Sequence, residues 1–179
     1  GQPSARYVWQ IAVAVTNKDD DTIEPAPIDT EVDNIAAFNA VEDGKNVKLT
    51  LAGARVNAYW DLAGAYYVED ATGATVIKGV TLTPGTALRG YIVGVKSTNS
   101  EINYVNTPAV AVEYTLTADD ILNVASSATT LTGTVMTIGE ACAQASYGRL
   151  VTLENVAISG TGQNKTLTDA NGNEMKARD

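Results

Sequence analysis

The feature that most constrains the fold of this chain is a set of segments that recur about 100 residues apart. The segment YVWQIAVAV (7–15) shares its Tyr-Val start and its AVAV end with YVNTPAVAV (104–112), and VKLTLAGARV (47–56) resembles RLVTLENVAI (149–158). Similarity at a fixed period indicates tandem structural modules. Chance similarity between β-rich segments is the alternative explanation.

The recurrence extends to a turn that follows each copy of the second segment. Asp70–Gly73 reads Asp-Ala-Thr-Gly and Asp169–Gly172 reads Asp-Ala-Asn-Gly. Aspartate followed three residues later by glycine is typical of a hairpin turn. Across the recurring segments the spacing lies between 97 and 102 residues, a drift that loops of different length would produce.

These spacings predict a chain that is out of phase with its own modules. Residues 1–31 supply an N-terminal strand (6–16) and an acidic, proline-containing linker, and residues 32–116 form one complete module. Residues 117–136 are a connector, and residues 137–179 form a partial second module. A partial module exposes an apolar face and unpaired strand edges, which is costly in water. We expect one of three remedies: continuation of the native chain past Asp179, packing of strand 6–16 on the partial module, or completion by another copy of the chain.

Alternating hydrophobicity identifies the first strand of the complete module and a bend within it. Val47, Leu49 and Leu51 alternate with polar residues, and the phase then slips across Gly53. An odd step that contains glycine indicates a β-bulge. The same slip occurs at Asn155 in the later segment. A long first strand that bends midway lets one strand serve both sides of a small barrel.

Further strands are predicted at 65–69, 75–78 and 86–96, followed by a last strand that Pro108 places at an edge. A short helix is expected between Asn34, a good N-cap, and Gly44. We therefore predict an all-β fold: a small five-stranded OB-like barrel followed by a partial second copy, each preceded by a short helix. The alternative is an immunoglobulin-like β-sandwich, whose usual cysteine and tryptophan markers this chain lacks.

Three stretches resemble a known group of modules: NIAAFNAVEDGKNVKLTLAGARV, the hairpin YYVEDATGA, and YGRLVTLENVAISG. They look like tandem OB-fold-like modules of uncharacterised secreted or surface proteins of anaerobic gut bacteria. The resemblance covers about 33–114 and 137–179. It implies an exported, often lipid-anchored chain, and its motifs are structural rather than catalytic.

Composition excludes several classes of chemistry. The chain has no histidine, which excludes Ser-His-Asp and Cys-His catalysis and imidazole metal ligands. Its single cysteine, Cys142, excludes an intrachain disulfide, and its position in a short helix predicts a small buried residue rather than a nucleophile. No apolar run approaches the ~20 residues of a membrane-spanning helix.

The acidic residues have structural explanations as well. The run Asp19–Glu24 resembles calcium ligands, but the prolines that follow favour a solvated linker. The segment Asp169–Glu174 lacks the spacing of a calcium loop and is predicted to be a hairpin turn. Glu69 and Asp70 are consecutive strand residues that point to opposite faces, so spacing alone cannot make them an acid–base pair. We predict no metal site and no cofactor.

An aromatic cluster is the candidate ligand-binding face: Tyr59, Trp60, Tyr66, Tyr67 and Tyr91. In OB-like barrels this loop and the neighbouring strands commonly bind oligonucleotides or oligosaccharides. The alternative is that Tyr66 belongs to the core and Trp60 covers the mouth of the barrel. Nucleic acid is disfavoured because residues 33–112 hold six Lys/Arg against seven Asp/Glu, without a basic stripe.

Together these features predict a non-catalytic extracellular or cell-surface module that serves as a spacer, an adhesion surface or a carbohydrate-binding barrel. Its expected partners are a glycan, another surface protein, or a second copy of the chain through strand exchange. The main alternative is an OB-fold that binds single-stranded nucleic acid. A hydrolase would require carboxylates brought together from different strands.

Overall fold

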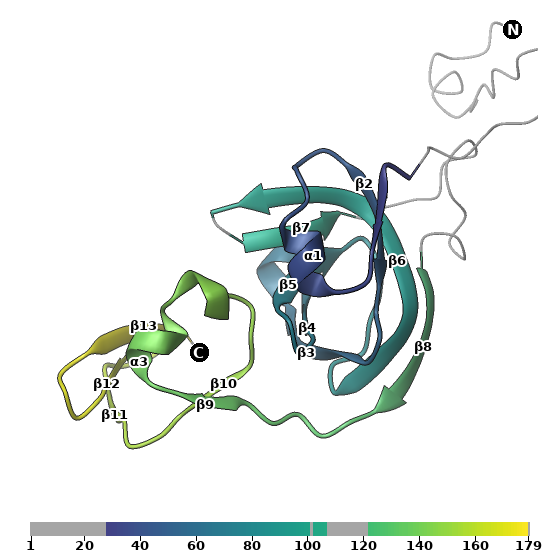
Figure 1. Cartoon of the computed structure of the whole chain (residues 1–179). Coiled ribbons are helices and arrows are strands. Elements are labelled where there is room, and N and C mark those ends of the chain that lie inside the picture. The colour runs from purple at the N-terminus through teal and green to yellow at the C-terminus, as the bar shows by residue number, and fades with distance from the viewer. Residues whose placement is uncertain (1–27, 101, 107–121, 179) are drawn as a thin grey trace, which may run out of the picture.

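The computed structural model describes residues 28–100, 102–106 and 122–178, and β-strands dominate them (Figure 1). The all-β class predicted from the sequence is therefore confirmed. Three predicted features lie outside the described residues: strand 6–16, the acidic run 19–24, and the strand interruption at Pro108.

Five strand units pair in a continuous circuit in the first half of the chain. β3 pairs with β4, β4 with β5, β5 with β7, β7 with β6, and β6 again with β3. All of these pairs are antiparallel except β5–β7. The bounds of the strands are β2 (Asn46–Thr50), β3 (Ala54–Trp60), β4 (Ala65–Glu69), β5 (Ala74–Lys78), β6 (Thr86–Asn99) and β7 (Ile102–Asn106).

The first strand of this circuit is bent, as predicted, because β2 and β3 are consecutive pieces separated by Leu51–Gly53. β2 pairs with one part of β6 and β3 with another, so both pieces line the same long strand. Gly53 has φ = +81°, and its N–H donates to Leu88 O at 2.7 Å. Asn155, at the corresponding slip in the later segment, also has positive φ (+55°). Positive φ suits glycine and, less well, asparagine.

We expect Gly53→Val to destabilise the fold by about 1 kcal/mol or more, because a β-branched residue is strained at positive φ. The space around Gly53 is open, so backbone strain is the only cost. Urea unfolding of the variant and the parent measures the difference. An unchanged midpoint would contradict the requirement for positive φ at the bend.

The short helix predicted before the first strand is α1 (Ile35–Asn39), which follows strand β1 (Thr30–Val32). Asn34 caps it: its Oδ1 accepts from the N–H of Ala37 at 2.8 Å. Two more N–H groups of the helix are satisfied by the β4–β5 turn, since Ile35 donates to Asp70 Oδ2 and Ala36 donates to Thr72 Oγ1. The turn therefore fixes the helix against the end of the strand pair, and Ile35 and Phe38 are fully buried.

One continuous core fills the space between these elements, and it is built from the alternating residues that the sequence pattern selects. Its members come from α1 and from every strand of the circuit. The fully buried members include Phe38, Val47, Leu49, Leu51, Val56, Val68, Ile77, Ile92 and Val105.

A buried lysine ties the loop after α1 to β6. Lys96 is only 2% exposed, and its Nζ donates to Asp43 Oδ1 at 2.9 Å and to Thr98 Oγ1 at 2.8 Å. The hydrogen bond from Lys96 is the main cause that holds the pKa of Asp43 below its ordinary value. The pair compensates for the burial of the ammonium group.

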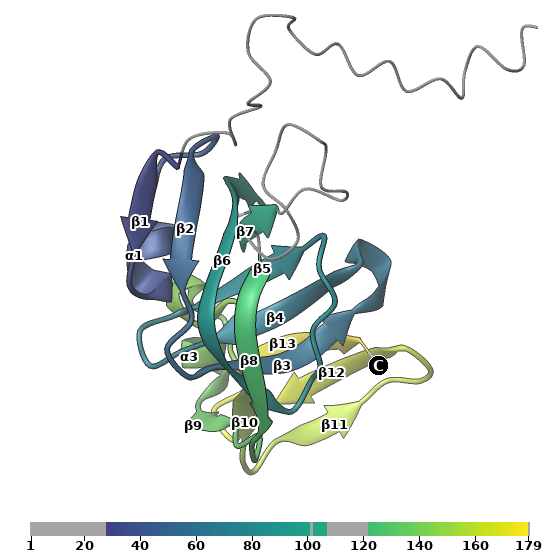
Figure 2. The same cartoon turned by 90° about the vertical axis from the view of Figure 1, so that its right-hand side faces the viewer.

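Residues 122–128, inside the predicted connector 117–136, form a strand in the structure. This strand, β8 (Leu122–Ala128), pairs antiparallel with β6 over seven residues. β6 is long enough to accept β7 along one part of its length and β8 along another. In Figure 2, β8 runs beside β6 and leads from the barrel to the C-terminal elements.

The strands and α-helices of the C-terminal part follow the same order as those of the first half of the barrel. The C-terminal elements are β9 (Thr134–Met136), α3 (Ile138–Ala141), a one-turn 3-10 helix (Gln144–Ser146), β10 (Val151–Leu153), β11 (Ala157–Ser159), β12 (Asn164–Thr168) and β13 (Glu174–Arg178). The 3-10 helix differs in its place, since it lies between β3 and β4 in the barrel (Asp61–Ala63) and between α3 and β10 here. β9 pairs parallel with β10, as β1 does with β2. β11, β12 and β13 form an antiparallel sheet, as β3, β4 and β5 do.

This shared order is what the hypothesis of a repeat requires, and the repeat itself stays a prediction. The helices begin alike, since Thr137 caps α3 in a capping box with Glu140. The turns are alike too, since Asp169 accepts hydrogen bonds from the N–H groups of Asn171 and Asn173. The two parts of the chain differ in how far their hydrophobic side chains are buried. Among the described hydrophobic residues from 134 onward, Ile138 is the only buried one.

Candidate functional site

The five predicted aromatic residues do not form one surface. Tyr59 and Tyr66 face each other across β3 and β4, with ring centroids 4.9 Å apart. Trp60 and Tyr67 stack with centroids 5.7 Å apart and planes at 13°. The sheet alternates its side chains, so the two pairs lie on opposite faces.

Each pair has a different environment. Tyr66 packs against the main core, as the alternative interpretation proposed, and Tyr59 is 49% exposed beside it. Tyr91 lies on β6, where it pairs with Thr50, and its ring lies 5.0 Å from Lys48 Nζ. It is therefore part of the β2–β6 surface rather than of the β3–β4 hairpin.

The stacked pair belongs to a second apolar cluster, here called the outer aromatic cluster: Trp60, Tyr67 and Tyr104. The cluster packs on Ala65 and Val76, outside the main core. Tyr104 is 5% exposed, and Lys78 Nζ lies 4.9 Å from its ring centroid. Burial raises the pKa of Tyr67, with a further contribution from Tyr104, and burial raises the pKa of Tyr104. Both phenols therefore stay neutral near pH 7.

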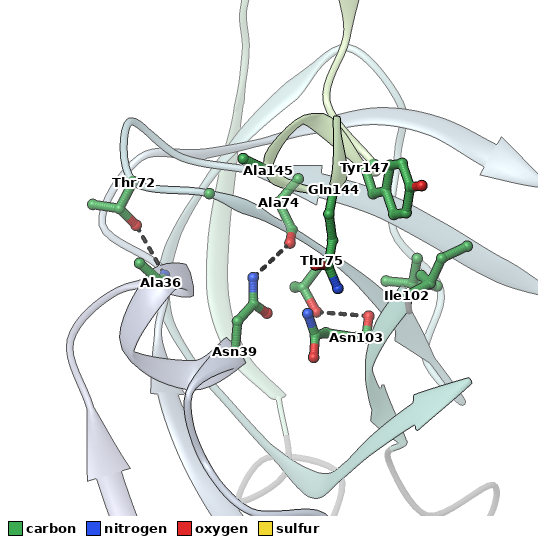
Figure 3. A pocket seen from close by; sticks show the side chains of 13 residues that line it. Ala36, Asn39, Thr72, Ala74, Thr75, Ile102, Asn103, Gln144, Ala145 and Tyr147 are labelled. Carbon is green, nitrogen blue, oxygen red and sulfur yellow. Dashed lines mark hydrogen bonds between the residues drawn. The ribbon is translucent and has the colours of Figure 1, made fainter. Parts of the chain in front are cut away.

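A cavity of about 380 Å³ lies next to this cluster, between the barrel and the 3-10 helix of the C-terminal part (Figure 3). The barrel contributes α1, the β4–β5 turn with β5, and the start of β7. The opposite wall is the segment 144–148. The side chains that line the cavity with polar groups are Asn39, Thr72, Thr75, Asn103, Gln144 and Tyr147.

Among the described residues, the polar groups that line the cavity are neutral amides and hydroxyls, and none of the lining side chains is charged. Several are already oriented by the protein: Asn39 Nδ2 donates to Ala74 O at 3.0 Å, and Thr75 Oγ1 donates to Asn103 O at 3.0 Å. Asn39 Oδ1 is buried and has no hydrogen-bond partner among the described residues. In Figure 3, Gln144 extends from the opposite wall toward Thr75 and Asn103.

The opposite wall is held in place by a buried carboxylate. Glu69 is 3% exposed and forms an ion pair with Arg55. Its Oε2 also accepts from Asn57 Nδ2 at 2.9 Å and from the N–H of Leu150 at 2.8 Å. Arg55 Nη1 in turn donates to Thr132 O at 3.2 Å. Two points of the C-terminal part, Thr132 and Leu150, are thus tied to the β3–β4 hairpin.

Gly148 lets the chain approach the barrel closely at this wall. A Cβ on Gly148 would lie 3.3 Å from Ala74 Cβ and 3.6 Å from Tyr67 Cδ1, and its φ is +81°. Beside it, a smaller cavity of about 230 Å³ is lined by Asn57, Tyr67 and the segment 148–150, together with Ala58. Asn57 Oδ1 is buried and also lacks a partner among the described residues.

The two adjacent carboxylates have structural roles, consistent with their opposite directions on the strand. Glu69 anchors the C-terminal wall, as described above. Asp70 organises the β4–β5 turn and caps α1. Burial raises the pKa of Asp70, but the hydrogen bonds from Thr72, Ile35 and Gly73 together outweigh it, so the pKa lies below its ordinary value. Asp70 is therefore a hydrogen-bond acceptor rather than a proton donor at neutral pH.

Within the described ranges, no group of three or more Asp, Glu, Cys or His side chains is arranged to hold a metal ion. Cys142 is exposed, so the prediction that it is a buried residue is wrong. It follows the end of α3, whose inward side is occupied by Ile138 alone. In the part of the chain that the structure describes, no helix has the length and apolarity needed to cross a membrane.

Models of known protein families and curated proteins give no match to this chain. The resemblance to OB-like modules of gut bacteria therefore stays a prediction.

Sequence reasoning missed most of the side chains that surround the cavity. Tyr104, in the neighbouring outer aromatic cluster, carried a signal, because it aligns with Tyr7 in the recurring segments. Asn39, Asn103, Gln144 and Tyr147 carried none, since they come from α1, β7 and the segment 144–148, which only the tertiary fold brings together.

Proposed function

We propose that the strand circuit is an OB-like barrel and that it acts as a non-catalytic module that binds a neutral glycan. The ligand would occupy the cavity between the barrel and segment 144–148, beside the outer aromatic cluster. The observation that carries this proposal is that the described residues lining the cavity supply amides, hydroxyls and an aromatic ring and no charged side chain. Such groups hydrogen-bond sugar hydroxyls, and aromatic faces cover the apolar faces of sugars.

The unpartnered Asn39 Oδ1 supports a ligand that donates hydrogen bonds. A buried carbonyl oxygen without a partner costs roughly 1–3 kcal/mol. A sugar hydroxyl that reaches it would recover part of that cost on binding. Gln144 and Asn103, on opposite walls, supply both donors and acceptors within the same cavity.

The same lining argues against single-stranded nucleic acid, the alternative ligand. Binding of nucleic acid depends on neutralising phosphates with Lys and Arg. The described residues that line the cavity include neither Lys nor Arg, and those of the smaller neighbouring cavity include Arg149 alone. The roles of Glu69 and Asp70 as structural acceptors likewise support binding rather than catalysis, because both carboxylates are committed to the fold.

The broader role we propose is that of an extracellular or surface-exposed unit in an array of similar modules. The predicted repeat supports this role, since the strands and α-helices of residues 134–178 follow the order of those in the barrel's first half. A glycan or another surface protein is then the expected partner.

We expect the full chain to bind at least one neutral oligosaccharide in a panel of glucan, xylan and mannan fragments. Isothermal titration should give a Kd that changes little between about 50 mM and about 200 mM salt. Tyr147→Ala, which removes a ring from the cavity wall, should weaken binding about tenfold, the equivalent of roughly 1.4 kcal/mol.

Tyr91→Ala is the matched control, because Tyr91 is also a partly exposed tyrosine but lies on the β2–β6 surface. It should bind as the parent does. Strong, salt-dependent binding to oligothymidine without binding to any oligosaccharide would replace this proposal with the nucleic-acid alternative.

A further inference from the structure

The sheet of β11, β12 and β13 has an apolar face that the other described residues cover only in part. Ile158, Leu167 and Met175 lie directly opposite one another in register across the three strands, so they share one face. Ile158 is 67% exposed, and Leu167 and Met175 are partly exposed.

The matching positions in the barrel are fully enclosed. Val56, Val68 and Thr75 lie in register across β3, β4 and β5, and their exposed fractions are 0%, 0% and 2%. The difference lies in what packs against them, because β6 and β7 complete the barrel around the first three strands. The second sheet has the same layout without such cover among the described residues.

The edge of β13 is also open in the described part of the chain. β5, its counterpart by element order, pairs with β4 on one side and with β7 on the other. Among the described strands, β13 pairs with β12 alone. An unpaired edge beside an exposed apolar face is a template for an added strand.

The chain itself contains a second segment with the sequence of β7. In β7, Tyr104 pairs with Val76 and Val105 pairs with Ile77 in parallel register. Val105 is fully buried in the main core, and Tyr104 lies on the other side in the outer aromatic cluster. Tyr7 and Val8 begin the segment 7–15, which shares this Tyr-Val start and the later AVAV with residues 104–112.

We propose that residues 7–15 of a second copy of this chain add to the edge of β13 as a parallel strand. Val8 then faces Ile158, Leu167 and Met175, as Val105 faces the core of the barrel. A second copy is the favoured source because β1 and β13 lie on different sides of the barrel in both views (Figures 1 and 2). The contact joins two different surfaces, so two copies that exchange the segment reciprocally close as a dimer, and copies that do not exchange it continue head to tail.

This proposal is independent of the glycan site, and its test measures the assembly state. Sedimentation velocity of the full chain from ~1 µM to ~200 µM should show growth beyond the monomer with concentration. Deletion of residues 1–16 should leave a monomer throughout. A synthetic peptide of residues 5–16 should bind to the deletion variant, because the edge of β13 is then free.

Ile158→Asp tests the receiving face and Ser159→Asp is its matched control. Both side chains are exposed on β11, but consecutive residues point to opposite faces. Ile158→Asp should weaken assembly at least tenfold, and Ser159→Asp should not.

A full chain that stays monomeric would overturn the proposal, as would assembly that survives the deletion. If the full chain is monomeric and the deletion alone exposes Ile158 to a hydrophobic dye, the strand comes from the same chain instead. Oligosaccharide binding by the Ile158→Asp variant separates a failure of this contact from a failure of the glycan site.

Discussion

Replacing Glu69 with alanine should destabilise the protein by about 3 kcal/mol, because the change leaves a guanidinium and two N–H donors without their acceptor at a buried site. The donors are Arg55, Asn57 Nδ2 and the N–H of Leu150. Arg55 is about one quarter exposed, so water compensates for part of its loss, whereas Asn57 is 8% exposed. Urea unfolding followed by far-ultraviolet circular dichroism measures the change in free energy.

Glu31→Ala is the matched control for this prediction. Glu31 also pairs with a cation, Lys48, at 3.2 Å, but the side chain of Glu31 is 64% exposed. Exposed pairs typically contribute less than about 1 kcal/mol. Equal losses in the two variants would contradict the view that burial, and not the presence of an ion pair, makes Glu69 important. Because Glu69 also holds Leu150, its alanine variant should lose oligosaccharide binding at the neighbouring cavity.

The local features of the fold could be predicted because each depends on residues close in sequence. The bend at Gly53 follows from a phase slip in the hydrophobic alternation, and the helix start follows from the capping preference of Asn34. The β4–β5 hairpin follows from aspartate and glycine at the spacing that a tight turn requires. In each case the signal and the structure involve the same few residues.

The candidate site could be predicted only in part, because it depends on which face of a strand each residue occupies. Four of the five predicted aromatic residues lie on the β3–β4 hairpin, but consecutive residues such as Tyr59 and Trp60 must point in opposite directions. This alternation of side chains divides the predicted cluster between the two faces of the sheet, although its residues are close in sequence. Tyr104 joins Trp60 and Tyr67 through the parallel pairing of β5 and β7, which sequence spacing does not reveal.

The contact between the barrel and the C-terminal part could not be predicted, because its sequence separations are large. The hydrogen bond from Leu150 to Glu69 joins residues 81 positions apart. β8 was missed for a related reason. Its Ser- and Ala-rich sequence has little hydrophobic alternation, and it forms a strand because β6 offers it an edge. The exposure of Cys142 was missed for another reason. A helix of four residues is too short to bury a full face, and α3 buries only Ile138.

The close approach of β6 and β7 makes Gly94 the position at which the smallest substitution should have a large effect. A Cβ at Gly94 would lie 2.7 Å from Val105 Cγ1 and 3.0 Å from Asn106 O. Both distances are too short for a carbon contact, and the second atom belongs to the backbone of β7. We expect Gly94→Ala to cost about 2–3 kcal/mol, because β7 must shift away from β6 and the core around Val105 must repack. Urea unfolding gives the loss of free energy, and hydrogen exchange should show reduced protection in β6 and β7.

Gly139→Ala is the control, since it adds the same methyl group where there is room for it. The nearest atom to a Cβ at Gly139 is Thr137 Oγ1 at 4.0 Å, and the residue lies within α3. Alanine is favoured over glycine in a helix by roughly 0.5–1 kcal/mol, so this variant should be as stable as the parent or slightly more stable. If Gly94→Ala were equally well tolerated, β7 would have to pack against β6 more loosely than the structure shows. In that case the close contact at Gly94 would not fix the spacing between β6 and β7 in the circuit β3–β4–β5–β7–β6. A loss of protection from hydrogen exchange in β7 alone, with β6 still protected, would lead to the same conclusion. Two tightly packed strands should lose or keep their protection together.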